Sequence, residues 1–184
     1  SLNHPNIVQV YEFGRAGDGY FLAMELVDGC DLATLLRDHV GVGLPGGAAA
    51  WVFLELLDAL GYVHGVAGAD GRALGLVHRD VSPHNVLIGR AGEVKLADFG
   101  IATATARLRD DGVKGKFAYM SPEQARGDTV DARTDLFAVG AMLYEALSGR
   151  RMYATRDADA LHALALRAEV EPLDHVAPAL HPSL

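Results

Sequence analysis

Two short stretches near the N-terminus, 7–14 and 19–26, carry apolar residues that alternate or run together around a turn-rich segment at 15–18. Strand-like runs on either side of a short turn predict an antiparallel β-hairpin. A lone hairpin is only marginally stable in water, and no third strand precedes this one in the chain. We therefore expect an incomplete sheet with an exposed edge, in a chain that starts inside a larger domain.

The pattern after residue 30 is mainly helical. It predicts a short helix over 31–40 with Asp31 as its N-cap, and a longer one over 48–64. The longer helix should be mostly buried, because its polar positions fall on a single stripe, formed by Glu55, Asp58 and Tyr62. The glycine-rich stretch 65–75, with an Asp-Gly turn, is expected to be an exposed loop.

A third helix is predicted over 134–149, where Glu145 is the one charged residue between Asp135 and Gly149. A helix that is apolar on every side belongs in the interior of a domain. Thr134 or Asp135 is expected to cap its N-terminus and Gly149 its C-terminus. A last helix is predicted over 157–168, and the proline-containing tail that follows shows no periodicity.

Composition narrows the class of protein without indicating its chemistry. The chain has 184 residues, is 50% hydrophobic and carries a net charge of -8, so it can form one domain or part of one. The absence of a Lys/Arg cluster argues against nucleic-acid binding. Cys30 is the single cysteine, which excludes an internal disulfide and favours a reducing, cytoplasmic location. No uninterrupted apolar run reaches roughly 18 residues, so we expect no membrane segment in this chain.

The chemistry is concentrated in HRDVSPHN at 78–85, where Asp80 precedes Asn85 by five residues, and in Asp98-Phe99-Gly100, which begins thirteen residues after Asn85. Two carboxylates and a carboxamide on adjacent loops suit Mg²⁺-assisted phosphoryl transfer. The segments SPEQ at 121–124 and TDLFAVG at 134–140 follow in order. Together these motifs resemble the C-terminal lobe of a protein kinase, most like the bacterial serine/threonine kinases of the eukaryotic type.

The resemblance implies an α+β, protein-kinase-like fold: a mostly helical C-terminal lobe over 27–184, truncated, and a remnant of the N-terminal lobe over 1–26 that holds the hairpin and leads into the hinge. It places a catalytic loop at 78–85 and an activation segment at 98–123. The glycine-rich loop and strand lysine of the family are not found in this sequence. We therefore expect this stretch alone to bind ATP weakly and not to turn over without the missing N-lobe and C-terminal helices.

Within the resemblance, Asp80 accepts the proton of a protein substrate's hydroxyl, while Asn85 and Asp98 hold Mg²⁺, or Mn²⁺ in its place, against the ATP phosphates. Met24 is implied as gatekeeper, the backbone of Glu25 and Val27 as adenine partners, Asp31 as ribose acceptor and Leu87 as pocket floor. Structural roles are implied for His78, Phe99, Gly100, Glu123 and Asp135. Without the motif, Asp80 would be interpreted as a turn residue, and Met24 and Leu87 as core residues.

Two positions depart from the family pattern. Serine/threonine kinases usually have Lys two residues after the catalytic Asp, where this chain has Ser82, and Thr in the substrate-facing loop, where it has Lys116. We hypothesise that Lys116 supplies the missing cation near Asp80 and that Ser82 takes the hydroxyl role. The alternative is that Lys116 is a solvated surface lysine and the enzyme is slow or inactive.

Regulation is expected to involve the activation segment. Arg79 would normally pair with a phosphorylated threonine there, yet no Ser or Thr lies between Thr105 and Ser121. Asp110 and Asp111 are predicted to substitute in part for phosphate, against the alternative of an exposed acidic turn. Thr103 and Thr105 remain the candidates for modification.

Three functions are compatible with these patterns. The first is part of an active serine/threonine protein kinase of the cytoplasm, or of the cytosolic part of a larger membrane-attached protein. The second is a noncatalytic kinase-like scaffold, which Ser82 and the missing parts favour. The third is a small-molecule phosphotransferase, which shares an Asp-to-Asn loop but needs no peptide-docking element such as SPE.

Overall fold

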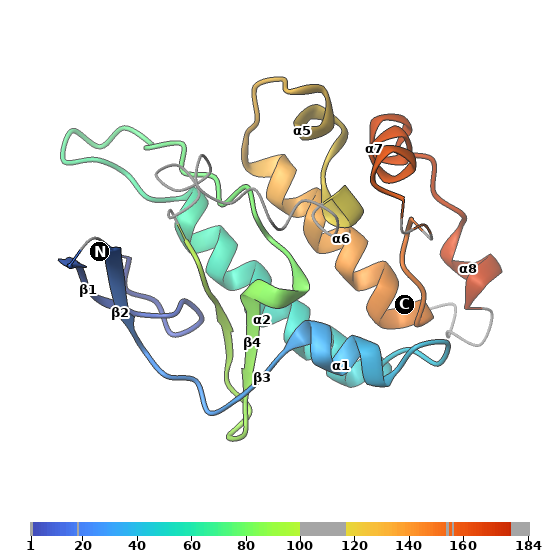
Figure 1. The fold of residues 1–184 in the computed structure, drawn as a ribbon, viewed down its shortest axis with the longest axis horizontal. Coiled ribbons are helices and arrows are strands. Elements are labelled where there is room, and N and C mark those ends of the chain that lie inside the picture. The colour runs from blue at the N-terminus through green and yellow to red at the C-terminus, as the bar shows by residue number, and fades with distance from the viewer. Residues whose placement is uncertain (1, 18, 100–116, 154, 156, 178–184) are drawn as a thin grey trace.

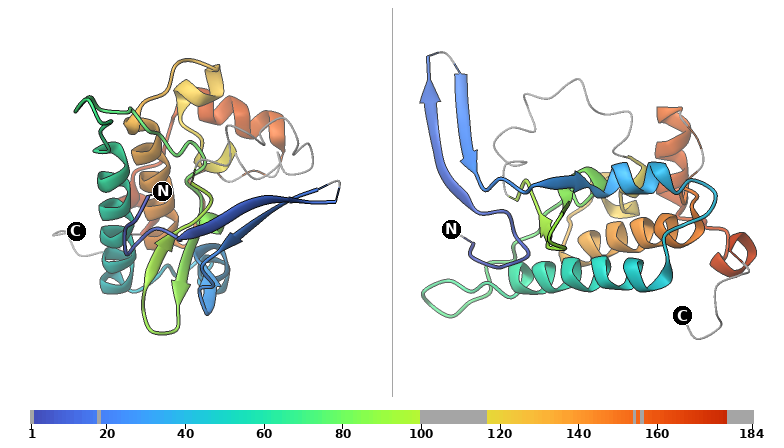
Figure 2. Two further views of the ribbon diagram at one scale, coloured as in Figure 1. Left: turned by 90° about the vertical axis from the view of Figure 1, so that its left-hand side faces the viewer. Right: turned by 90° about the horizontal axis from the view of Figure 1, so that it is seen from below.

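The computed structural model describes residues 2–17, 19–99, 117–153, 155 and 157–177. Helices form the body of the molecule, a small sheet of order β3-β4-β5 lies on one side of it, and a two-stranded sheet, β1-β2, projects away (Figures 1 and 2). The α+β architecture predicted from the sequence is confirmed.

The projecting sheet is the predicted hairpin, in which β1 (Val10–Ala16) pairs antiparallel with β2 (Gly19–Met24). Most of its residues are exposed, and the rings of Phe13 and Tyr20 stack with centroids 5.6 Å apart. The strand begins later than predicted because the apolar residues before it pair elsewhere. Ile7 forms a parallel bridge with Leu96, and the amide of Val8 donates to the carbonyl of Leu96 at 2.9 Å.

The core lies where two long helices, α2 (Gly46–His64) and α6 (Ala132–Ser148), pack side by side. Both were predicted to be largely interior, and Met142 and Ala146 of α6 are fully buried. By length and composition alone, α2 is apolar enough to cross a membrane. In this structure its buried face packs against α6 and the sheet, through Ala49, Val52, Phe53, Leu56, Ala59, Leu60 and Val63.

The polar stripe of α2 binds the N-terminal segment of the chain. The amide of the Asn6 side chain donates to the Glu55 carboxylate and, at 3.0 Å, to the carbonyl of Val94. His4 lies 3.4 Å from the Asp58 carboxylate and stacks on the Tyr62 ring. The stripe is therefore an intramolecular contact surface that holds the base of the hairpin against the helical body.

The second sheet contains β3 (Gly29–Asp31), β4 (Val86–Gly89) and β5 (Val94–Leu96). β3 was not predicted because three residues are too few to show alternation. Helix α1 (Leu32–Asp38) follows it directly, and the Asp31 carboxylate accepts from the amide of Thr34 at 2.8 Å, as predicted for its N-cap. A single turn of 3₁₀-helix, Pro83–Asn85, leads into β4, and another covers Phe117–Tyr119.

The N-terminal cap predicted for α6 is wrong. The helix begins at Ala132, and Asp131, in extended conformation, accepts from the amide of Arg133 at 2.8 Å. Thr134 and Asp135 lie inside the first turn, and their side chains bind partners elsewhere in the chain: Thr134 binds Glu123, and Asp135 binds the amides of His78 and Arg79. Gly149 closes the helix as predicted, with φ of 66° and its amide donating to the Glu145 carbonyl.

The remaining elements are short. Helix α5 (Pro122–Arg126) precedes α6, and α7 (Ala158–Arg167) is the predicted last helix with Asp157 as its cap. Beyond it, the four-residue helix α8 (Leu173–Val176) was not predicted. The loop over 65–75 is mostly exposed, as expected, and an isolated bridge between Ala67 and Ala73 gives it a hairpin form.

Candidate active site

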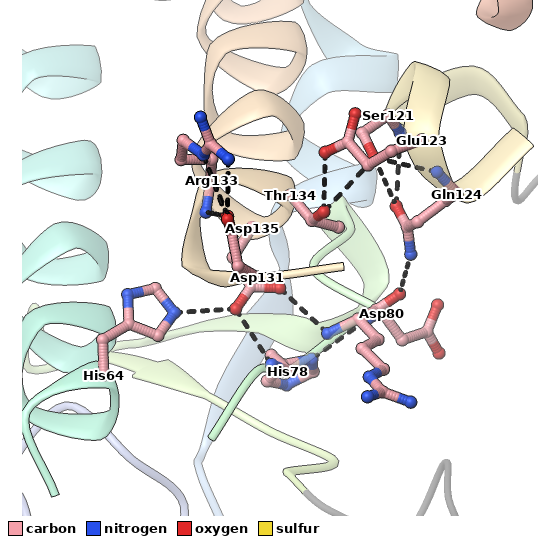
Figure 3. Close-up of polar contacts among 11 residues, drawn as sticks. His64, His78, Asp80, Ser121, Glu123, Gln124, Asp131, Arg133, Thr134 and Asp135 are labelled. Atoms are coloured by element: carbon pink, nitrogen blue, oxygen red, sulfur yellow. Dashed lines mark hydrogen bonds and ion pairs between the residues drawn. The ribbon is translucent and has the colours of Figure 1, made fainter. Parts of the chain in front are cut away.

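A buried carboxylate on α6 organises the loop that contains HRDVSPHN. Asp135 is 1% exposed, and its two oxygens accept from the amides of His78 and Arg79, each at 2.9 Å. The Nε2 atom of His64, at the end of α2, lies 2.8 Å from the same carboxylate (Figure 3). A buried carboxylate is stable only with such partners. Asp135 therefore ties the loop to both core helices.

The His78 ring connects this loop to the segment after β5. It is 2% exposed, and burial lowers its pKa. The amide of Asp80 can only donate, and it donates to Nδ1 of His78 at 3.3 Å. The proton of the neutral ring must then be on Nε2, which donates to the Ala97 carbonyl at 3.0 Å. The same ring packs against the Phe99 ring in a T-shaped arrangement, with centroids 5.0 Å apart.

Asn85 and Asp98 come together through the β4-β5 hairpin. The amide of Ala97 donates to the carbonyl of Asn85 at 2.8 Å. Asp98 is the next residue along the chain, so its backbone begins beside Asn85. The Asn85 side-chain amide donates to the carbonyl of Asp80 at 2.7 Å, so its side-chain oxygen is the atom of this group that could bind a metal. Arg79 and Asp98 have φ of 68° and 59°, and non-glycine residues in this left-handed region cluster at functional sites.

These two side chains fit a magnesium or manganese ion that is shared with phosphate. Within the described ranges, no group of three or more His, Cys, Asp or Glu side chains forms a metal site. Mg²⁺ commonly takes one or two carboxylates and completes its shell with water and substrate phosphates. A carboxylate and a carboxamide on adjoining loops are therefore a suitable protein contribution.

A depression of ≈ 450 Å³ beside the loop contains three of the predicted nucleotide-binding residues, Val27, Asp31 and Leu87. His84 lines it too, and its Nδ1 atom lies 3.1 Å from the Asp31 carboxylate. Met24, which is 40% exposed, is not in this lining. The side chain of Glu25 is also outside it, because its carboxylate pairs with Lys95 at 2.9 Å; a hydrogen bond from Lys95 lowers the pKa of Glu25.

On the other side of the loop lies α5, which begins with a capping box. The Ser121 hydroxyl accepts from the amide of Gln124, and the Ser121 amide donates to the Gln124 side-chain oxygen. The hydroxyl of Thr134 donates to the Glu123 carboxylate at 2.7 Å. The predicted structural residue Glu123 is thereby bonded to the first turn of α6.

Comparison with known proteins identifies the family of this chain. Residues 1–179 match the family model described as a protein kinase domain. The chain belongs to the protein kinase family. It is 42% identical over 97% of its length to the tyrosine-protein kinase MasK of Myxococcus xanthus. It is 38% identical over 82% of its length to the serine/threonine-protein kinase PrkC of Bacillus subtilis, and 40% identical over 81% to PknB of Mycobacterium leprae. It spans 28%, 22% and 24% of those kinases, respectively.

The kinase fold brings together most of the described residues that were predicted for the site. Ser82, half-buried, begins the 3₁₀ turn, and its carbonyl accepts from the amide of Asn85 at 2.9 Å. Arg79 is exposed. Six predicted residues lie outside the described part of the chain: Gly100, Thr103, Thr105, Asp110, Asp111 and Lys116.

Sequence reasoning missed three residues of this kinase site. His64 pairs with Asp135, His84 with Asp31, and Gln124 donates to the carbonyl of Arg79 at 2.8 Å. A weak signal existed for Gln124, since Ser followed three residues later by Gln is the sequence pattern of a capping box. His64 and His84 carry no such signal, because their partners are distant in sequence.

Proposed function

We propose that the full-length protein containing this chain is a protein kinase that transfers the γ-phosphoryl group of ATP to serine or threonine hydroxyls of proteins. The observation that carries the proposal is the set of hydrogen bonds around the backbone of Asp80. Its amide donates to His78, and its carbonyl accepts from Asn85. Ala97, next to Asp98, is in turn hydrogen-bonded to His78 and to Asn85. In the proposed kinase, this network would hold the proton acceptor Asp80 and the metal-binding side chains of Asn85 and Asp98 on adjoining loops. In the same proposal, 1–26 is part of the N-lobe and 27–184 of the C-lobe.

Each residue has a separate task in this reaction. Asp80 orients the substrate hydroxyl and accepts its proton as the oxygen attacks phosphorus. Asn85 and Asp98 would hold Mg²⁺ or Mn²⁺, which neutralises charge on the phosphates when bound. Because the loop is held by hydrogen bonds to buried residues, little reorganisation is required when the substrate arrives.

The nucleotide base and ribose would occupy the depression that contains Val27, Asp31 and Leu87. Its aliphatic side chains can contact the flat faces of adenine, and the Asp31 carboxylate can accept from a ribose hydroxyl. Glu25 and Met24 would contribute from the hinge, the former through its backbone. Because cells supply ATP in the cytoplasm, the proposed function includes a cytoplasmic location for this site.

The proposal is tested by incubating full-length protein with [γ-³²P]ATP, Mg²⁺ and a protein acceptor such as casein or myelin basic protein. We expect label on the acceptor, or on the kinase itself, and its loss with a chelator. Acid hydrolysis should release phosphoserine or phosphothreonine. Absence of transfer, with ATP binding retained in equilibrium dialysis, would instead support the noncatalytic scaffold. Transfer to a small alcohol or aminoglycoside but to no protein would indicate a small-molecule phosphotransferase.

Tyrosine is a second candidate acceptor, and one feature of the sequence favours it. Ser82 has a short side chain at the position where serine/threonine kinases usually carry a lysine, so more room is left beside Asp80 for a long phenolic side chain. MasK, 42% identical to this chain, is named a tyrosine-protein kinase. Phosphotyrosine in the same hydrolysate would decide for this candidate.

We also propose that Lys116 compensates for the lysine missing at Ser82, as the exchange of residue types between the two positions suggests. Transition-state charge in phosphoryl transfer requires a nearby cation. Lys116→Ala in full-length protein should therefore lower kcat by about 10²-fold, with Lys116→Arg retaining most activity. Wild-type turnover in Lys116→Ala would contradict the proposal. The regulatory roles of Arg79, Asp110, Asp111, Thr103 and Thr105 stay predictions.

A further inference from the structure

The backbone polar groups of two consecutive residues, Arg79 and Asp80, bind side chains. Asp135 accepts from the Arg79 amide at 2.9 Å, and Gln124 donates to the Arg79 carbonyl at 2.8 Å. The ring of His78 accepts from the Asp80 amide, and Asn85 donates to the Asp80 carbonyl. Each of the four backbone polar groups thus has a partner, which fixes the peptide planes on both sides of the Asp80 side chain.

Gln124 differs from the other three partners in its origin. His78 and Asn85 belong to the catalytic loop, and Asp135 is a buried residue of the core helix α6. Gln124 comes from α5, the helix that contains the end of the predicted activation segment. Its hydrogen bond therefore joins that segment to the peptide unit that immediately precedes Asp80 (Figure 3).

The orientation of the Gln124 amide group is determined by its two partners. The Ser121 amide is a donor and lies 3.2 Å from the side-chain oxygen, so this atom must accept. The Arg79 carbonyl is an acceptor and faces the side-chain nitrogen, which must donate. One side chain thus performs two separable tasks: its oxygen caps α5, and its nitrogen holds the catalytic loop.

We propose that Gln124 is a positioning residue for the catalytic carboxylate: it transmits the placement of α5 to Asp80 through the Arg79 carbonyl. The inference rests on the proposed kinase function. Arg79 has φ of 68°, a conformation that side-chain-bearing residues adopt at a cost, so loss of the Gln124 bond loosens this peptide unit, which the 3.3 Å bond from the Asp80 amide to His78 still holds. Rotation there turns the Asp80 side chain away from the substrate hydroxyl without touching the nucleotide depression.

Three substitutions separate the two tasks of Gln124. Gln124→Glu keeps an oxygen for the Ser121 amide, and glutamate is a common capping-box residue, but it places an acceptor against the Arg79 carbonyl. Gln124→Lys keeps a donor for that carbonyl and loses the capping oxygen. Gln124→Met has similar size and loses both.

The kinetic test uses full-length protein at saturating peptide. We expect kcat to fall about threefold to tenfold in the Glu and Met variants, as for loss of one neutral hydrogen bond, while the Lys variant stays near wild type. KM for ATP should be unchanged in all three. Thermal unfolding should give a different order, with the Lys and Met variants less stable than the Glu variant. If kcat follows the order of thermal stability, or if KM for ATP changes with kcat, the positioning role is wrong.

A second measurement does not depend on activity. Hydrogen–deuterium exchange of peptides covering 78–85 should be faster in Gln124→Glu than in wild type, and near wild type in Gln124→Lys. Unchanged exchange in the Glu variant would overturn the inference. If wild type transfers no phosphate but exchange rises as expected, the proposed function fails while the structural link between α5 and the loop stands.

Discussion

Asp80→Asn should lower kcat of the full-length kinase by about 10²–10⁴-fold, the range that a general base contributes. Asparagine keeps the size of the side chain and can still orient a hydroxyl, but its amide cannot accept the proton. KM for ATP should change little, because the depression containing Val27, Asp31 and Leu87 does not include Asp80. Rates of ³²P transfer to a peptide measure the effect directly.

The fold should tolerate this substitution. The contacts of Asp80 with the His78 ring and with Asn85 are made by its backbone, and asparagine retains both groups. Equal unfolding temperatures and equal ATP affinity in the two proteins would show that the lost rate is chemical. Undiminished transfer by Asp80→Asn would exclude Asp80 as proton acceptor and direct attention to another carboxylate.

Asp135→Asn should cost about 2–4 kcal/mol in the free energy of unfolding, because buried hydrogen-bond donors left without acceptors carry penalties of this order. The carboxylate accepts from two amides, those of His78 and Arg79, and binds the His64 ring. Asparagine offers one side-chain oxygen in place of two. Its NH₂ group, a donor, would therefore face one of the donors that now bind the second carboxylate oxygen. Urea denaturation followed by circular dichroism measures the loss.

The same helix offers a matched control, Asp131→Asn. Asp131 caps α6 at the surface, and asparagine is as good an N-cap as aspartate, so this variant should stay within about 0.5 kcal/mol of wild type. Asp135→Asn should also reduce kcat, since the loop that holds Asp80 loses its anchor. Equal stability of the two variants would refute the structural role assigned to Asp135.

Much of the secondary structure could be predicted because it depends on residues that are close together in the sequence. The hairpin has two apolar runs around a turn, Asp31 stands at the start of an apolar helix, and Gly149 ends another with positive φ. The start of α6 could not be predicted in this way. Asp131, Thr134 and Asp135 all suit an N-cap, and the choice depends on distant partners that draw Thr134 to Glu123 and Asp135 to the catalytic loop.

The site was predictable where a motif specifies both residue types and spacing. The motif predicted two adjoining loops, and the pairing of β4 with β5 brings Ala97, next to Asp98, against Asn85. The roles of Asp80, Asn85 and Asp98 stay predictions. Gln124 was not predicted as a site residue because its partner is a backbone carbonyl 45 residues away, which leaves no trace in local sequence. The contacts of the polar stripe of α2 with His4 and Asn6 were not predicted either, because these partners are also distant in sequence.

The base of the hairpin is attached to two neighbouring residues of β5. One attachment is the Val8–Leu96 hydrogen bond, supported by His4 and Asn6 on α2, and the other is the Glu25–Lys95 ion pair. Both attachments end on adjacent residues of β5, while β1 and β2 are exposed along most of their length. The α2-α6 core packs through residues of its own, so a tilt of the exposed strands leaves it intact. The hairpin can therefore change its tilt without unfolding any element of the helical body.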